Sequence, residues 1–194
     1  MNFLNRVQNF FADSVETKRQ AGEALGETIV LAGELLATQI NAGHKVLSCG
    51  NGGSAADAQH FSSEMVNRFE KDRRALAAVA LSTDTSTLTS IANDSDYTRV
   101  FARQVEALGQ NGDVLLAIST SGQSANINAS IKQARQQNMR VVALSGKDGG
   151  EMARLLGPED VELRVPSNST ARIQETHLLI LHCLCDLIDQ MLND

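Results

Sequence analysis

Tryptophan is absent from the 194 residues, proline occurs twice, and aromatic side chains make up only 4% of the chain. Surfaces that stack nucleic-acid bases or sugar rings need flat aromatic side chains, so this composition disfavours both kinds of site. Basic residues are also in the minority, with 17 Lys and Arg against 23 Asp and Glu and a net charge of −6. We therefore expect no direct binding to nucleic acid and no anionic membrane surface as a partner.

Long apolar runs and a cysteine framework are missing as well. No uninterrupted apolar stretch approaches the roughly 18 residues that a membrane-spanning helix needs, and the N-terminal segment is too polar for a signal peptide. Three cysteines, Cys49, Cys183 and Cys185, do not make a disulfide framework in a chain of this size. We interpret them as reduced, buried side chains and expect a cytoplasmic protein without a membrane-spanning segment.

The chain changes character near residue 45. Before it, apolar side chains recur at helical spacing in two predicted helices, and Asn41–Gly43 closes the second. After it, short apolar runs alternate with amphipathic stretches, a pattern typical of a parallel sheet with helices on both faces. The sequence thus predicts one α/β domain, residues 43–194, behind an N-terminal helical extension, residues 1–42. We expect strands at 45–50, 77–82, 113–120, 140–146 and 160–166, and helices near 53–69, 84–108, 123–137, 149–156 and 170–192.

Two segments that follow predicted strands are rich in glycine and hydroxyl groups. Residues 50–54 read Gly-Asn-Gly-Gly-Ser, and residues 119–124 read Ser-Thr-Ser-Gly-Gln-Ser. Ligands of parallel sheets bind beyond the carboxyl ends of the strands, and each segment leads into a helix N-terminus, which suits a phosphate. Ordinary turns with capping residues have similar sequences, but two such loops together favour a shared phosphate pocket. Neither loop matches a nucleotide P-loop or the G-x-G-x-x-G of dinucleotide sites.

His60 and Glu64 stand one turn apart on one face of the helix that follows the glycine loop. Such a pair can bind a metal ion or act as an acid and a base, although ordinary surface pairs with this spacing are common. The helix starts at the proposed phosphate pocket, and this position favours a functional role.

The last predicted helix carries Gln174 and His182. His182 lies among apolar residues, so an ordinary buried histidine is an equal alternative to a functional one. Eight residues separate Gln174 from His182, which is about 12 Å along a helix. Both reach one metal ion only if the helix begins later than expected or if the site draws on helices from two subunits.

Asn93 and Asp94, in the segment SIANDSDY, fall between two helical stretches. Side chains of these types cap helices and also hydrogen-bond sugar hydroxyls. The sequence by itself favours the cap.

Five segments together resemble the bacterial phosphoheptose isomerase family of the sugar-isomerase (SIS) domain superfamily. They are KVLSCGNGGSAADAQHFSSE, SIANDSDY, GDVLLAISTSGQSANI, VVALSGKDGG and RIQETHLLILH. The resemblance implies a flavodoxin-like, five-stranded parallel sheet between helices, in a homotetramer with active sites at subunit interfaces and an N-terminal extension that serves oligomerisation. It also implies conversion of sedoheptulose 7-phosphate to D-glycero-D-manno-heptose 7-phosphate through an enediol, the first step toward the heptose of lipopolysaccharide.

The resemblance also implies roles for individual residues. Glu64 and His182 would form the catalytic acid/base pair. Some family members bind zinc, and the matching positions here all hold competent ligands, so we expect one Zn²⁺ per subunit. These ligands are His60, Glu64, Gln174 and His182. The implied substrate contacts are Asn51, Gly52, Gly53, Ser54, Glu64, Asn93, Asp94, Ser119, Thr120, Ser121, Ser124 and Gln174.

A second resemblance leads to a different class of protein. The segments LLGPEDVEL and HCLCDLID are similar to the DnaA initiator-associating proteins, non-enzymatic relatives that act in replication initiation. We expect those relatives to lack acid/base residues at the positions of Glu64 and His182, which are intact here. The isomerase is therefore the primary prediction, and the initiator-associating protein is the alternative.

Overall fold

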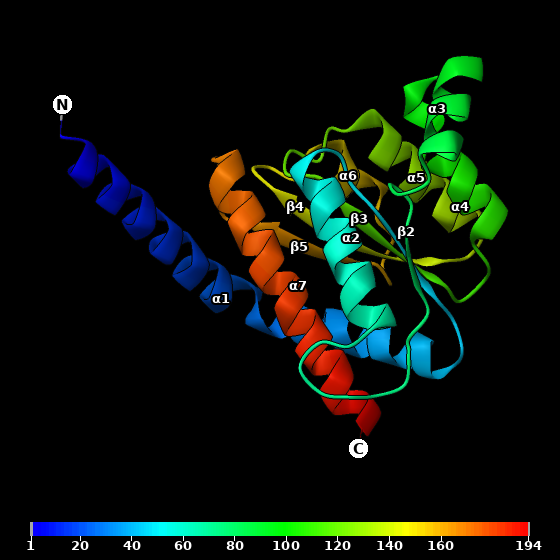
Figure 1. Ribbon diagram of the computed structural model, residues 1–194, viewed down its shortest axis with the longest axis horizontal. Coiled ribbons are helices and arrows are strands. Elements are labelled where there is room, and N and C mark those ends of the chain that lie inside the picture. Colours follow the sequence, from blue (N-terminus) through cyan, green and yellow to red (C-terminus); the bar gives the residue numbers. More distant parts are fainter. Residues whose placement is uncertain (1, 194) are drawn as a thin grey trace.

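A computed structural model describes residues 2–193 of the chain. Its centre is a sheet of five parallel strands in the order β2-β1-β3-β4-β5 (Figure 1). This is the flavodoxin-like order, in which the direction of winding reverses between β1 and β3. The predicted fold class and all five predicted strands are confirmed. The strands are β1 (Val46–Cys49), β2 (Ala78–Ala80), β3 (Val114–Ile118), β4 (Arg140–Gly146) and β5 (Val161–Val165).

Helices cover both faces of the sheet, because alternate strand side chains reach opposite sides. Val46 and Leu116 belong to the core beneath α1, α2 and α7, whereas Leu47 and Leu115 belong to the core beneath α4, α5 and α6. The helices are α1 (Phe3–Asn41), α2 (Gly53–Val66), α3 (Thr85–Asp94), the 3₁₀ helix η1 (Tyr97–Arg99), α4 (Ala102–Leu108), α5 (Ala125–Gln136), α6 (Gly150–Leu155) and α7 (Thr170–Asn193).

The N-terminal extension is one helix of 39 residues, so the prediction of two helices is wrong. The polar stretch between the two apolar segments, residues 12–28, holds no proline and contains three Ala and three Glu, which favour helix, so α1 runs through it. The predicted end is confirmed. Gly43 adopts φ +90°, and its N–H donates to the carbonyl of Ile40.

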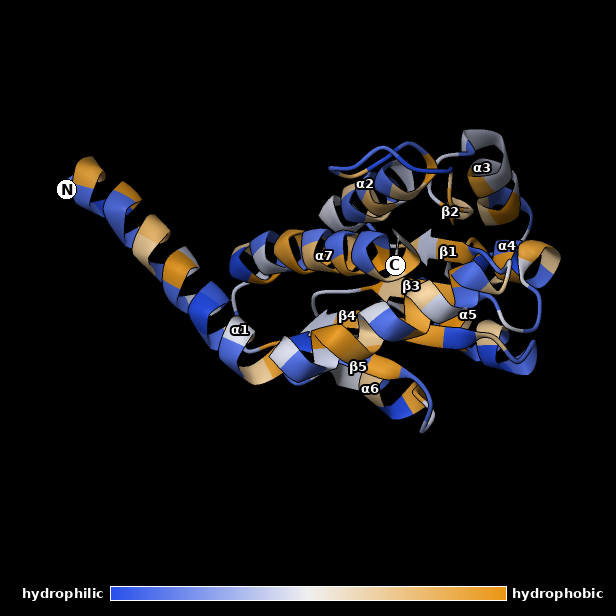
Figure 2. Ribbon diagram, turned by 90° about the horizontal axis from the view of Figure 1, so that it is seen from below, coloured by the Kyte–Doolittle hydropathy of each residue, from blue (hydrophilic) through white to orange (hydrophobic). Residues whose placement is uncertain are grey.

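The two halves of α1 have different surroundings. From Ala21 onward the helix contributes buried side chains to the core shared with α2 and α7. The first half extends away from the body of the protein (Figures 1 and 2) and exposes a series of apolar side chains. These are Phe3, Leu4, Val7, Phe10, Phe11 and Val15. The division of the chain at residue 42 stays a prediction.

The prediction of one continuous helix over residues 84–108 is wrong, because three shorter helices occupy that segment. The stretch is rich in Thr, Ser, Asn and Asp, whose side chains compete for backbone hydrogen bonds. Asp84 caps α3, and Asp96, in extended backbone, caps η1 by accepting the N–H of Thr98 at 2.7 Å. Each cap starts a new helix.

All three cysteines are free thiols. Burial raises the pKa of Cys49 and of Cys185 to about 12, and burial also raises the pKa of the half-buried Cys183. Thiols in this state are poor nucleophiles at neutral pH, in line with the sequence interpretation. No helix within residues 2–193 is long and apolar enough to cross a membrane.

Candidate active site

The loop between β1 and α2 is folded so tightly that it needs glycine. A Cβ on Gly50 would lie 2.3 Å from the carbonyl oxygen of Ser54, and one on Gly53 would lie 2.6 Å from Nε2 of Gln174. Gly52, the N-cap of α2, has φ +57° in the left-handed region. Without Cβ atoms at these positions, the backbone turns directly into the helix and a ligand can approach its N–H groups closely.

Asn51, in the same loop, is held by Asn126, which the sequence analysis missed. Nδ2 of Asn51 donates to Oδ1 of Asn126 at 2.8 Å, and Nδ2 of Asn126 donates back to Oδ1 of Asn51 at 2.9 Å. Asn126 is buried in the first turn of α5, so this amide pair joins the loop after β1 to the helix after β3. The signal in the sequence was an asparagine in the first turn of a helix that follows a hydroxyl-rich loop.

The loop between β3 and α5 is braced from within and from outside. The hydroxyl oxygens of Ser119 and Ser124 lie 2.9 Å apart in a hydrogen bond. Gly122 has φ +64°, and a Cβ there would lie 1.9 Å from the carbonyl oxygen of Gly149 in the turn before α6. The carbonyl of Gly122 also accepts the N–H of Met152 at 2.9 Å. The loop is therefore fixed against the end of β4.

The N-termini of α2 and α5 both lack a side-chain cap. The N-cap of α2 is Gly52, which has no side chain to offer. The N-cap of α5 is Ser124, whose hydroxyl bonds Ser119 instead of a helix N–H. Since capping does not explain these residues, the geometry favours the alternative, two helix N-termini side by side that together suit an anion such as phosphate.

Three of the predicted site residues meet between α2 and α7. The Nε2 atoms of His60 and His182 lie 2.9 Å apart, and Oε1 of Glu64 lies 3.5 Å from the His60 nitrogen. The ring of Phe69 stacks on His182 at a centroid distance of 5.6 Å. A carboxylate and two imidazoles in one half-exposed cluster provide the groups that proton transfer requires.

Gln174 lies apart from this cluster. Helix α7 is continuous from Thr170, so the alternative of a later start is wrong. Gln174 packs against Gly53 at the glycine loop, two turns of α7 before His182. Within residues 2–193, no group of three or more His, Cys, Asp or Glu side chains is arranged to hold a metal ion. One chain alone does not bring the four predicted metal ligands together.

Asp57 is a second residue that the sequence analysis missed. It stands one turn before His60 on α2, and its Oδ2 atom is buried without a hydrogen-bond partner in the described part of the chain. Desolvation raises the pKa of Asp57 to about 6, although the charge of His60 opposes this shift. Carboxyl groups perturbed in this way gather at functional sites. The sequence indicated this residue only through its spacing of three from His60, which places both side chains on one face of the helix.

Asn93 and Asp94 end α3 and are exposed, with Nδ2 of Asn93 donating to Oδ1 of Asp94 at 2.8 Å. The favoured role as a cap is wrong, because Asp96 caps the helix that follows. Their side chains are therefore available for a ligand.

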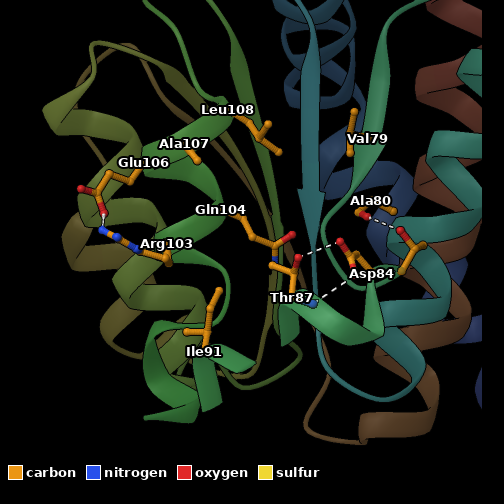
Figure 3. A pocket seen from close by; sticks show the side chains of 11 residues that line it. Val79, Ala80, Asp84, Thr87, Ile91, Arg103, Gln104, Glu106, Ala107 and Leu108 are labelled. Carbon is orange, nitrogen blue, oxygen red and sulfur yellow. Dashed lines mark hydrogen bonds and ion pairs between the residues drawn. The ribbon is translucent and has the colours of Figure 1, made fainter. Parts of the chain in front are cut away.

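A separate cavity of about 600 Å³ opens between β2, α3 and α4 (Figure 3). Its wall includes the apolar Val79 and Ile91 and the ion pair of Arg103 and Glu106. None of the predicted site residues is among the described side chains that line it. The cavity and the phosphate loops are distinct features of the fold.

Known proteins match both the sequence and the fold. The family model of the SIS domain matches residues 9–146. The phosphoheptose isomerase of Alkalilimnicola ehrlichii is 64% identical over 192 residues, which cover 99% of this chain and 98% of that protein. The phosphoheptose isomerase of Coxiella burnetii is 59% identical over 99% of this chain and 96% of its own length.

Solved structures agree with these matches. A phosphoheptose isomerase from Neisseria gonorrhoeae has a TM-score of 0.93 at 50% identity, over 97% of this chain and 100% of that chain. One from Francisella tularensis has a TM-score of 0.95 at 43% identity, over 98% and 100%. The chain therefore belongs to the SIS-domain family and, within it, to the phosphoheptose isomerases.

Proposed function

We propose that this protein converts sedoheptulose 7-phosphate to D-glycero-D-manno-heptose 7-phosphate, the first step toward the heptose of lipopolysaccharide. One observation carries the proposal. Glu64 lies in a cluster with His60 and His182, on the same helix whose N-terminus forms part of the phosphate pocket. Isomerisation of a sugar phosphate requires both an acid/base group and an anion site. Because eleven residues, about 16 Å along α2, separate Gly53 from Glu64, one active site would combine the loops of one subunit with the cluster of its neighbour.

The phosphate of the substrate would be held by the N–H groups at the starts of α2 and α5 and by the hydroxyls of the loop after β3. Ser119 and Ser124 already share one hydrogen bond, and Thr120 and Ser121 are partly exposed beside them. Helix-end N–H groups and hydroxyls bind an anion without lysine, which agrees with the net charge of −6. The exposed pair Asn93–Asp94 would contact the sugar hydroxyls.

The chemical step moves one proton between adjacent carbons. Glu64 would remove the proton from C1 of the ketose, and His182 would protonate the oxygen on C2, which gives the 1,2-enediol. Return of the proton to C2, with loss of the proton from the C1 hydroxyl, then yields the aldehyde at C1. The two groups exchange the roles of acid and base between these half-reactions.

The donor atoms in the cluster suit a zinc ion, because two imidazole nitrogens and a carboxylate oxygen are typical zinc ligands. In the structure the Nε2 atoms of His60 and His182 lie 2.9 Å apart in a hydrogen bond beside Glu64, so the two rings would move apart to admit the ion. We propose that these three residues hold one Zn²⁺ per subunit and that Gln174 is supplied as a fourth ligand across a subunit interface. When bound, the ion would polarise the carbonyl oxygen of the substrate.

We also propose a homotetramer with active sites at subunit interfaces. The apolar side chains on the first half of α1 include Phe3 and Phe11, which are 72% and 71% exposed. Apolar surface of this kind on a projecting helix is typical of an interface, because burial against another copy removes it from water. Gln174 also lies too far along α7 to join His182 within one chain.

A cytoplasmic location is part of the same proposal. The three cysteines are free, as expected in a reducing compartment. The substrate and product would then remain where phosphorylated sugars are made and used.

A coupled assay with sedoheptulose 7-phosphate tests the function directly. Formation of the aldose phosphate supports the isomerase. The alternative is a DnaA initiator-associating protein, which would leave the substrate unchanged and bind purified replication initiator. Wild-type protein that does not convert the sugar phosphate and does retain the initiator would overturn our proposal in favour of that alternative.

A further inference from the structure

The last turn of α2 contains Glu64, and its carbonyl groups have no partners within the helix. Arg73, from the loop that follows, supplies them. Its guanidinium donates to the carbonyl of Glu64 at 2.8 Å and to the carbonyl of Met65 at 2.9 Å. A cation at the C-terminus of a helix is also favoured by the helix dipole. Arg73 therefore holds the turn of α2 on which the proposed base is mounted.

The same guanidinium reaches α7. Nε of Arg73 lies 2.5 Å from Oδ1 of Asp189, and both side chains are buried, with 4% and 2% of their surface exposed. Asp189 follows His182 by seven residues, so the two lie on the same face of α7, two turns apart. One side chain thus connects the helix that carries Glu64 to the helix that carries His182.

The loop that carries Arg73 makes further contacts with α7. It leaves α2, passes across the C-terminal part of α7 and returns to β2 (Figure 1). Phe69 in this loop stacks on the ring of His182, and Lys71 donates to Oε1 of Gln190 on α7 at 3.0 Å. The loop therefore contacts α7 before and after Asp189, and Arg73 makes the buried contact between them.

We propose that Arg73 is a positioning residue that sets the distance between Glu64 and His182, a role that rests on the acid/base function proposed for that pair. Arginine suits this position for a geometric reason. Its planar group donates several hydrogen bonds in fixed directions, whereas the ammonium of lysine is a point charge on a flexible stem. The replacement of Arg73 by lysine therefore keeps the charge and loses the simultaneous hold on both helices.

The test compares R73K with two control variants. We expect R73K to fold and to lower kcat on the order of 10²-fold, because an active-site group displaced by about 1 Å costs that much, while KM changes less than about threefold. The neighbouring exposed Arg74 offers the matched substitution R74K, which should leave kcat unchanged. Unchanged kcat in R73K would overturn the proposal.

The test must also distinguish a variant that only destabilises the fold from one that displaces Glu64 relative to His182. Asp113 is a second buried aspartate in an ion pair, with Lys45, at the N-terminal ends of β1 and β3 and therefore away from the loops that follow these strands. We expect D113N to lower the melting temperature without changing kcat, whereas D189N lowers both. Equal effects of D189N and D113N on kcat would assign Arg73 a structural role only.

A crystal structure of R73K gives a readout that does not depend on activity. We expect the separation of the Nε2 atoms of His60 and His182 to be longer in R73K than in the wild type and unchanged in R74K. An unchanged separation in R73K would overturn the positioning role even if kcat falls. Wild-type protein without isomerase activity would instead overturn the proposed function, and the comparison of the crystal structures would still decide whether Arg73 sets the position.

Discussion

The Nε2 atoms of His60 and His182 lie 2.9 Å apart, although 122 positions separate the two residues in the sequence. One imidazole must donate its Nε2–H to the Nε2 lone pair of the other, so the contact requires that one of these two nitrogens carries no hydrogen. The carboxylate of Glu64 lies 3.5 Å from the same nitrogen of His60. These side chains form one interacting group, and we expect substitutions within it to have non-additive effects.

Replacement of Glu64 by glutamine removes the proposed base and keeps the shape of the side chain. We expect E64Q to lower kcat by about 10²-fold or more, as is typical for the loss of a positioned general base, with little change in KM. Steady-state kinetics with sedoheptulose 7-phosphate would measure this. The exposed Glu70 on the following loop provides the control E70Q, and a wild-type rate in E64Q would remove Glu64 from the mechanism.

Zinc binding can be tested by metal analysis of purified protein. We expect about one zinc per subunit in the wild type and a large loss in H182N, because that variant lacks one imidazole ligand. Added zinc should raise the melting temperature of the wild type by mass action and have little effect on H182N. The variant H44N, at the other end of the sheet, should keep its zinc. Equal zinc content in H182N and the wild type would contradict the proposed ligand.

The amide pair of Asn51 and Asn126 predicts an effect on substrate binding. In N126D a carboxylate oxygen replaces the Nδ2 group that donates to Oδ1 of Asn51, so this hydrogen bond is lost. The substitution also places a negative charge beside the proposed phosphate pocket. We expect KM to rise roughly tenfold or more, since each 1.4 kcal/mol corresponds to a factor of ten. Inhibition by inorganic phosphate should weaken in parallel. The exposed Asn111 offers the control N111D, and an unchanged KM in N126D would show that the pair does not support the pocket.

The apolar side chains on the first half of α1 predict a change in oligomeric state. We expect the wild type to sediment as a tetramer and the double variant F3S/F11S to dissociate into smaller species at the same concentration, because both side chains are largely exposed in one chain. Sedimentation velocity would measure the masses. A variant of a polar residue in the same segment, N9S, serves as the control. If F3S/F11S sediments like the wild type, the interface lies elsewhere.

His177 predicts a pH dependence of stability. It lies on the buried face of α7, its Nε2 atom lies 2.9 Å from the carbonyl oxygen of Ser145, and desolvation lowers its pKa from 6.5 to about 4. Between these values the unfolded chain binds a proton that the folded chain does not. The contribution of His177 to stability is therefore complete above pH 6.5 and is lost as the pH falls toward 4.

We expect the slope from this group to approach about 1.4 kcal/mol of unfolding free energy per pH unit in that window. Urea titrations of the wild type between pH 7 and pH 4.5 would measure it, with H177N as the comparison. The slope should be smaller in H177N, and identical slopes would show that another group titrates.

Much of the fold was predictable because it follows from local patterns. Buried strands of a parallel sheet appear as near-continuous apolar runs, and each run here became a strand. The errors lie where two local tendencies compete. Helix propensity carried α1 through its polar middle, and the aspartate caps at Asp84 and Asp96 broke the segment 84–108 into short helices. Neither the continuity of α1 nor the division of residues 84–108 is indicated by the spacing of apolar residues.

The site was predictable only in part, for a related reason. The glycine and serine loops are continuous in sequence, and their residue types report directly on backbone conformation and helix N-termini. Asn126 and Arg73 act through contacts with residues 75 and 116 positions away, and the pKa of Asp57 is perturbed by burial. A single sequence carries no record of such distances.

The sequence by itself determined the α/β class with its parallel strands, the two glycine- and serine-rich loops and the residue types of the proposed acid/base pair, because these depend on periodicity and on the chemistry of short segments. The strand order was implied by the family resemblance. The scarcity of basic residues agrees with our proposal that the pocket binds phosphate through N–H groups and hydroxyls. Only the tertiary structure decided that Glu64, His60 and His182 meet while Gln174 lies at the glycine loop. The packing of α2 along α7 sets those distances, and packing arises from the whole core.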